Sequence, residues 1–167
     1  MSDNRIKIAN ETNEEETVIL TKPTEMSYCK YKEVRNLNEA YINNTILQEL
    51  YTSERSRTTL SDCSVSPKSH IKTAYLHGIV DVFSGRFDKI IIGPCGYVQW
   101  SSCCTADEII VSGNLVLNAD DAATCVKRIV LNPGGKLICM SREAESRLNI
   151  TTPDGTAPRL NGHWICG

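Results

Sequence analysis

Cysteine and histidine are the residues of this chain that could bind a metal or form disulfides. The 167 residues include eight cysteines and three histidines. No two cysteines are spaced as Cys-x-x-Cys, the arrangement that many zinc sites use, so we predict no metal site. Because no secretory signal is recognised, we expect reduced thiols that fill inward positions as small apolar side chains. The cysteines are Cys29, Cys63, Cys95, Cys103, Cys104, Cys125, Cys139 and Cys166.

Carboxylates and one histidine are the other side chains that could act as catalytic groups. Asp120 and Asp121 are the only adjacent aspartates, and they follow Asn118 in a turn-forming stretch, so we expect a solvated corner. His77 could be compared with the catalytic histidine of left-handed β-helix acyltransferases, but their six-residue repeat is not sustained here. No carboxylate pair, nucleophile triad or phosphate-binding loop can be specified. We therefore expect no enzyme activity and no cofactor.

The strongest pattern in the sequence is a repeat within residues 88–140. The segment 88–98 (DKIIIGPCGYV) is echoed by 126–137 (VKRIVLNPGGKL), and a shorter relative lies between them at 107–117 (DEIIVSGNLVL). The last apolar residues of the three triplets, 19 and 20 residues apart, are Ile92, Val111 and Leu131. Self-similarity at a fixed period indicates a repeat architecture.

Each repeat is an apolar triplet, a turn rich in glycine or proline, and a second apolar alternation. The pieces have strand length and many β-branched residues, and no helical stripe runs through them. At a rise of about 3.3 Å per residue, one repeat can close three short strands into a triangular coil. Such a coil cannot bury its inward side chains alone, so coils must stack. We therefore predict an all-β, single-domain β-solenoid.

The residues expected to carry this fold are inward aliphatics and corner glycines. We expect Gly96, Gly113 and Gly135 at corners that require a positive φ or a close approach of backbone. A charge at an inward position would be buried without a partner and would destabilise the fold. The inward residues are Ile90, Ile92, Val98, Ile109, Val111, Leu115, Leu117, Ile129, Leu131 and Leu137.

The predicted boundaries are a flexible acidic tail over residues 1–16 and a solenoid over 17–165. The solenoid pattern is clearest over 62–163, with a long turn at 65–71. Residues 46–55 fit a strand better than the helix that their propensity also allows. The charged segment 141–147 is expected to be a solvated loop, and Ile150, 19 residues after Leu131, to open a final coil.

Charge and hydropathy exclude several classes of partner. A net charge of −2 and a pI near 5.9 give no electrostatic reason to expect nucleic acid or an anionic membrane. No apolar run approaches the roughly 20 residues that a membrane-spanning helix needs. We expect a soluble cytoplasmic protein.

Short turns (Val-x-Gly-x-Leu-x-Leu, 111–117) alternate with long ones (Leu-Asn-Pro-Gly-Gly-Lys-Leu, 131–137), joined through small residues, and this resembles the bactofilin family. The resemblance covers 62–163 well and 17–61 weakly. It implies a right-handed triangular β-helix that polymerises end to end without nucleotide into a cytoskeletal filament or scaffold. The partners would be further copies of the chain and cytoskeletal proteins.

In that family an aromatic residue before a glycine near the end of the domain supports the polymer contact. Here Leu160 stands at that place, before Asn161-Gly162, with two apolar residues close behind. The resemblance therefore implies a polymer contact at Leu160, Trp164 and Ile165. A physical reason points the same way, because the unpaired strands at the ends of a solenoid invite further strands.

Two alternatives remain open. One is a solenoid that does not polymerise and presents a flat face to a partner. The other is a Rossmann-like methyltransferase domain, in which a string like 130–138 (VLNPGGKLI) can occur near the end. The second lacks support earlier in the chain, because no glycine precedes Gly78 and no cofactor-binding loop can form there.

Overall fold

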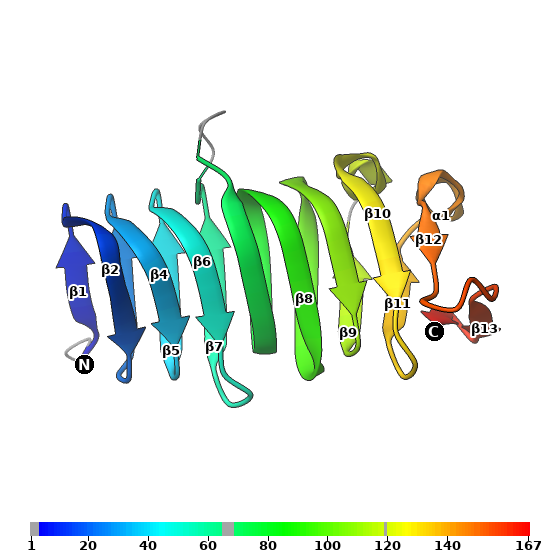
Figure 1. The fold of residues 1–167 in the computed structure, drawn as a ribbon, viewed down its shortest axis with the longest axis horizontal. Coiled ribbons are helices and arrows are strands. Elements are labelled where there is room, and N and C mark those ends of the chain that lie inside the picture. Colours follow the sequence, from blue (N-terminus) through cyan, green and yellow to red (C-terminus); the bar gives the residue numbers. More distant parts are fainter. Residues whose placement is uncertain (1–3, 65–68, 119) are drawn as a thin grey trace.

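The computed structural model describes residues 4–64, 69–118 and 120–167 and shows a β-solenoid of about eight turns. Figure 1 shows the coils following one another along a single axis, with the two ends of the chain at opposite ends of the molecule. The predicted all-β solenoid is confirmed. A Rossmann-like methyltransferase fold is excluded, because the parallel strands are joined by corners rather than by crossover helices.

Two parallel ladders of strands run along the axis. Ladder A consists of β2 (Thr12–Leu20), β4 (Lys30–Asn36), β6 (Ile46–Thr52), parts of β8 (Ile71–Val111), β10 (Val126–Leu131) and β12 (Ile150–Thr151). Ladder B consists of β1 (Ile6–Ala9), β3 (Thr24–Ser27), β5 (Glu39–Asn43), β7 (Arg57–Ser61), other parts of β8, β9 (Asn114–Leu117) and β11 (Lys136–Cys139). The chain alternates between the two ladders, and one strand of ladder A with the following strand of ladder B makes one coil.

The register of ladder A confirms the predicted period. Leu131 pairs with Val111, and Asn132 N–H donates to Val111 C=O at 2.9 Å. One coil earlier, Ser112 N–H donates to Ile92 C=O at 2.9 Å, which sets Val111 over Ile92 in the same way. All ten residues that the sequence assigned to the inward face are 0% exposed. The repeat was therefore read in the correct register.

The corners from ladder A to ladder B alternate in length as predicted over 76–139. The three glycines assigned to them are needed for space and not for a positive φ. A Cβ atom on Gly113 would lie 2.3 Å from Gly93 O, and one on Gly135 would lie 2.1 Å from Val111 O. Positive φ occurs instead at Gly78 (+69°) and Gly134 (+85°). The predicted long turn at 65–71 falls largely outside the described residues.

The corners that follow the first strands of ladder B use a device that sequence analysis missed. The residue after the strand adopts a positive φ at Asn10, Tyr28, Asn44 and Asp62. After Tyr28, Asn44 and Asp62 the next residue points inward and bonds back to the end of the strand, as Thr45 Oγ1 does by donating to Asn43 O at 2.9 Å. Glu11, which follows Asn10, is exposed instead. Left-handed φ values with an inward bonding side chain turn the chain without glycine.

The flexible tail expected over 1–16 is wrong from residue 6 onward. β1 pairs with β3, with Ile6 opposite Thr24, and β2 pairs with β4, with Val18 opposite Val34. The segment resembled a tail because the end coil is solvated on its outer side and carries a run of glutamates. Its inward side chains, Ile8 and Val18, nevertheless pack against the core.

Three expected features near the C-terminus, and the expected strand at 46–52, can be compared with the structure. Residues 141–147 form a capped helix, α1 (Arg142–Arg147), in place of a loop: Ser141 Oγ accepts a hydrogen bond from Ala144 N–H, and Ala144 is buried. The corner expected at Asp120 and Asp121 is a 3-10 helix, η1 (Asp120–Cys125). Ile150 pairs with Ile129, two residues from its predicted place. β6 confirms the strand preferred for 46–52.

Candidate functional site: the two ends of the solenoid

The N-terminal end of the solenoid presents an unpaired strand edge. Among the described residues, β1 pairs with β3 alone, through bonds that Ile6 N–H and Asn10 N–H donate to ladder B at 2.8 and 3.1 Å. Successive amides of a strand point to opposite sides, so those of Lys7 and Ala9 face away from β3. This edge can accept another strand.

The neighbouring edge, that of β2, is protected. Its pairing with β4 is interrupted by a register shift between Asn13 and Thr17, and the exposed residues in this bulge are Glu14, Glu15 and Glu16. Bulges and charges are the features by which natural sheets block pairing at an edge. β1 carries one charge, Lys7, and its pairing with β3 has no bulge, so the two edges of the end coil are not equivalent.

The inward side chains of β1 are apolar and partly open to solvent. Ile6 is 44% exposed and Ile8 packs against the core from this end, whereas Lys7 between them is exposed. β1 is held in place by Arg5, whose guanidinium lies 3.3 Å from Glu39 Oε1 and 4.3 Å from the centre of the Tyr41 ring. The edge is therefore both fixed and apolar, which favours a contact over fraying.

The C-terminal end is covered by the chain itself. β13 (Arg159–Asn161) and β14 (Trp164–Cys166) form a hairpin that pairs antiparallel with β11, with Ile165 opposite both Leu137 and Leu160. β12 extends ladder A by two residues. Figure 1 shows the hairpin and α1 closing this end, where no coil follows.

The structure places the three predicted contact residues in different environments. Ile165 is 6% exposed and belongs to the core, and Trp164 is partly buried. Leu160 is 74% exposed on the outermost strand. The three residues are neighbours, as the sequence suggested, but only Leu160 offers most of its side chain to a partner.

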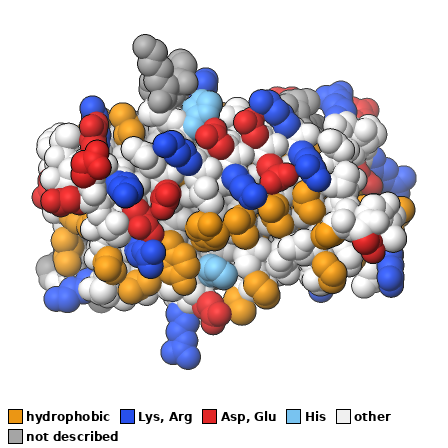
Figure 2. All heavy atoms as spheres, viewed as in Figure 1, with side chains coloured by type: hydrophobic (Ala, Val, Ile, Leu, Met, Phe, Trp, Pro, Cys, Tyr) orange, Lys and Arg blue, Asp and Glu red, His pale blue; other side chains and the backbone are white. Residues whose placement is uncertain are grey.

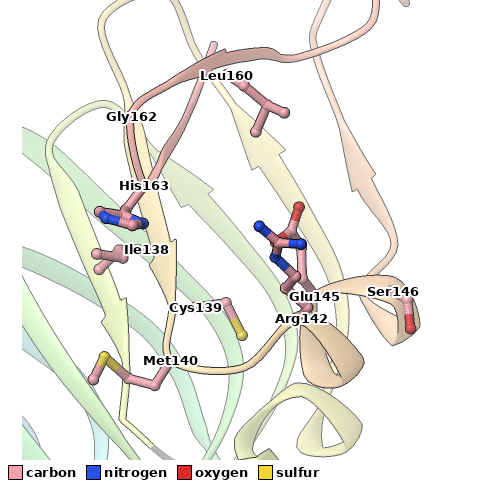
Figure 3. A pocket seen from close by; sticks show the side chains of 9 residues that line it. All are labelled: Ile138, Cys139, Met140, Arg142, Glu145, Ser146, Leu160, Gly162 and His163. Atoms are coloured by element: carbon pink, nitrogen blue, oxygen red, sulfur yellow. The ribbon is translucent and has the colours of Figure 1, made fainter.

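A pocket of about 870 Å³ lies beside Leu160. Figure 3 shows Leu160 and His163 on the hairpin, Ile138, Cys139 and Met140 on and after β11, and Arg142 and Glu145 reaching in from α1. The lining mixes apolar and charged side chains, as protein contacts do at their rim.

The buried cysteines have a structural role. The thiol of Cys63 donates to Ile42 O at 3.2 Å, and that of Cys104 donates to Val82 O at 3.2 Å. Burial raises the pKa of Cys63 to about 12 and that of Cys104 to about 11, so both stay protonated and poorly nucleophilic. None of the eight cysteines, all of which lie in the described residues, forms a disulfide, and Cys29, Cys63 and Cys104 are buried as expected, whereas Cys95 and Cys103 are exposed.

The described residues offer neither a metal site nor a membrane-spanning helix. They contain no group of three histidine, cysteine or acidic side chains that could hold a metal ion. No helix formed by these residues is long and apolar enough to cross a membrane.

The sequence pattern does not predict the open edge of β1, because residues 1–16 have the polar, acidic composition of a tail. The signal that could have found it is the alternation Ile6-x-Ile8 followed by Asn10, which stands 18 residues before Tyr28 in the next corner. Comparisons with family models, with curated proteins and with solved structures each found no match. The bactofilin resemblance therefore stays a prediction.

Proposed function

We propose that this chain is a structural scaffold of the bactofilin type, which assembles with itself end to end without a nucleotide, and that β1 makes the principal contact. The observation that carries the proposal is the edge of β1, which pairs with β3 alone among the described residues, whereas at the other end the hairpin of β13 and β14 covers β11. The bactofilin resemblance is the reason to place this scaffold in a cytoplasmic cytoskeleton, with cytoskeletal proteins as further partners.

The contact at β1 joins like ends. Two molecules related by a two-fold axis would pair their β1 strands antiparallel, and the amides of Lys7 and Ala9 would then find carbonyl partners. The same contact buries Ile6, which is 44% exposed in the single chain. An isologous contact of this kind closes on itself, so its first product is a dimer of twice the length.

Growth beyond the dimer requires a contact at the other end. Leu160 on the C-terminal hairpin, beside the 870 Å³ pocket, is the apolar group placed to make it. Hairpin-to-hairpin contacts between dimers would give a filament without polarity. The proposal thus separates two steps, dimerisation at β1 and elongation at Leu160.

Proline on the outward edge of β1 tests the first step. Lys7→Pro and Ala9→Pro each remove an amide that faces away from β3, and proline is tolerated at edge strands. We expect a wild-type dimer or filament by light scattering and electron microscopy. Both variants should form no filament, should reach at most the pair that the Leu160 contact joins, and should keep the β-type circular dichroism spectrum. Lys7→Ala keeps the amide and should assemble like the wild type.

Leu160→Arg tests the second step. Because Leu160 is 74% exposed, the variant should fold normally, retain the dimer and lose filaments. A wild-type chain that is monomeric at every concentration and forms no filaments would reject the proposal. Filaments that persist in both proline variants would reject the assignment to β1.

A further inference from the structure

The apolar triplets of ladder A place one aliphatic residue of each on the outer surface. In the triplets 90–92, 109–111 and 129–131 the first and third residues are 0% exposed and point inward. Successive side chains of a strand point to opposite faces, so Ile91, Ile110 and Val130 point outward. Uninterrupted apolar runs are typical of strands that are covered on both faces. The sequence therefore indicates that something covers this face.

The register aligns these residues in a continuous row. Val130 pairs with Ile110, and Tyr51 pairs with Tyr75 at the other end. Ile91 lies between Tyr75 and Ile110, because Ser112 N–H donates to Ile92 O and a Cβ on Gly93 would meet the His77 ring. We call Tyr51, Tyr75, Ile91, Ile110 and Val130 the apolar row. Figure 2 shows hydrophobic side chains crossing this face as a narrow band.

A row of mostly charged residues runs parallel to the apolar row. Two residues earlier on each strand, Glu33 pairs with Glu49, and Arg128 pairs with Glu108. Glu108 lies 3.5 Å from Lys89 Nζ and 3.4 Å from Arg128 Nη1. Figure 2 shows red and blue side chains above the hydrophobic band. The N-terminal half of the charged row holds Glu33, which is paired with Arg35 at 2.7 Å, and Glu49, whereas the C-terminal half holds both of the row's cations.

The shape of the apolar row distinguishes between possible occupants. It is one side chain wide and follows the solenoid axis, with rungs about 4.8 Å apart. A second copy packed face to face would lay one charged row on another and remove Lys89, Glu108 and Arg128 from water, which is costly. An α-helix rises about 5.4 Å per turn and can place one apolar residue on each rung while its flanks stay solvated.

We propose that the apolar row binds an amphipathic α-helix of a partner protein, laid along the solenoid axis. Val130 is only 9% exposed, so the open part of the row runs from Tyr51 to Ile110. These four rungs span about 14 Å, which corresponds to a helix of roughly 10 residues. On the flank that meets the charged row, the helix carries a basic residue near Glu49 and an acidic residue near Lys89. This binding site lies on the side of the solenoid and is independent of the end contacts.

Two synthetic peptides serve as probes for this site. Both are fluorescein-labelled helices of about 17 residues with leucine at every third or fourth position. The two peptides differ in the charges on one flank. In the first peptide this flank carries lysine in the N-terminal half and glutamate in the C-terminal half, and in the second peptide the order is reversed. We expect fluorescence anisotropy to show about tenfold tighter binding of one peptide, because like charges oppose docking of the other.

Two exposed tyrosines on different ladders give a matched pair of variants. Tyr75 of the apolar row is 45% exposed and Tyr97 of ladder B is 38% exposed, so lysine at either position should leave the fold intact. Tyr75→Lys should weaken binding of the preferred peptide at least about tenfold, since it places a charge in the centre of the row. Tyr97→Lys should leave binding unchanged. The double exchange Glu49→Lys with Lys89→Glu should reverse the order of the two peptides.

Several results would overturn the proposal. These are equal affinity for the two peptides, no binding of either one, or the same loss in Tyr75→Lys and Tyr97→Lys. Wild-type oligomers that dissociate in Tyr75→Lys but persist in Ala9→Pro would assign the row to a second copy of the chain instead.

Discussion

The N-terminal and C-terminal halves of the solenoid fill the same inward column with different chemistry. At the end of each ladder A strand, the C-terminal half places Leu76, Ile92, Val111 and Leu131, all 0% exposed. The N-terminal half begins the column with Leu20 but continues it with Asn36 and Thr52, which are also fully buried. The inward position at the end of the ladder A strand is therefore polar in two coils of the N-terminal half and apolar throughout the C-terminal half, although the backbone path is the same.

The polar residues of the column are satisfied by hydrogen bonds within the core. Asn36 Nδ2 donates to Thr58 Oγ1 at 2.8 Å and to Arg57 O at 3.2 Å. Thr52 Oγ1 donates to His77 O at 2.7 Å and accepts from His77 N–H at 2.9 Å. The comparison teaches that the column must be filled and bonded but need not be apolar.

Exchanging the chemistry of the C-terminal half should have the largest effect. Val111→Asp buries a carboxylate among aliphatic residues with no partner, and we expect it to cost about 4 kcal/mol or more. Urea unfolding followed by the fluorescence of buried Trp100 measures this loss. Ile110→Asp on the adjacent, outward position should cost less than about 1 kcal/mol. Equal unfolding midpoints for the two variants would show that the column is not the core.

This contrast also explains how far the sequence could be read. The C-terminal coils were predictable because Ile109, Leu115 and their counterparts are apolar at every repeat, so that period and face coincide. The N-terminal coils were obscured because Asn36 and Thr52 interrupt the pattern at inward positions. Corner residues such as Tyr28 and Asp62 share a φ value and not a residue type, so they leave no repeated letter.

The candidate site was less predictable than the fold. Leu160 could be selected from the sequence, but the separation of its environment from that of Ile165 depends on which side of the hairpin each residue faces. The edge of β1 is defined by having one paired neighbour, β3, within the part of the chain that the structure describes, and a single strand carries no sign of this. The apolar triplets were recognised, whereas their outward middle residues required a confirmed strand register.

The bonded pair in the N-terminal half provides the second test of the comparison. Asn36→Ala leaves Thr58 Oγ1 and Arg57 O buried without their donor, and we expect a loss of about 2 kcal/mol. Thr58→Val should also destabilise the fold, because it leaves the amide of Asn36 without its hydroxyl acceptor.

Replacing both partners distinguishes bonding from packing. In Asn36→Leu with Thr58→Val the two apolar side chains fill the column as they do in the C-terminal half, so the double variant should recover most of the stability. The wild type, Asn36→Leu, Thr58→Val and the double variant form a double-mutant cycle in urea unfolding. Strictly additive losses would mean that the Asn36–Thr58 bond contributes little, and that the two halves differ in packing alone.

The smallest expected effect concerns the corner thiols, which are alike in the two halves. Cys63 in the N-terminal half donates to Ile42 O, and its pKa is raised by burial from 9.0 to about 12. Between these values the unfolded chain loses the thiol proton and the folded chain keeps it. Stability from this group is therefore complete below pH 9 and is lost as the pH rises towards 12.

Cys63→Ser should leave stability at pH 7 nearly unchanged, because a hydroxyl fills this corner in the preceding coil, where Thr45 donates to Asn43 O. Above pH 9 the variant should lose stability more slowly than the wild type. Tyr31, whose pKa is raised to about 12 by burial and by its bond to Glu11, contributes to both proteins, so their difference isolates the thiol. Cys104→Ser should flatten the same alkaline limb, over a window that ends near pH 11. If parallel pH profiles were found for the wild type and both variants, the alkaline sensitivity would belong to Tyr31 rather than to the corner thiols.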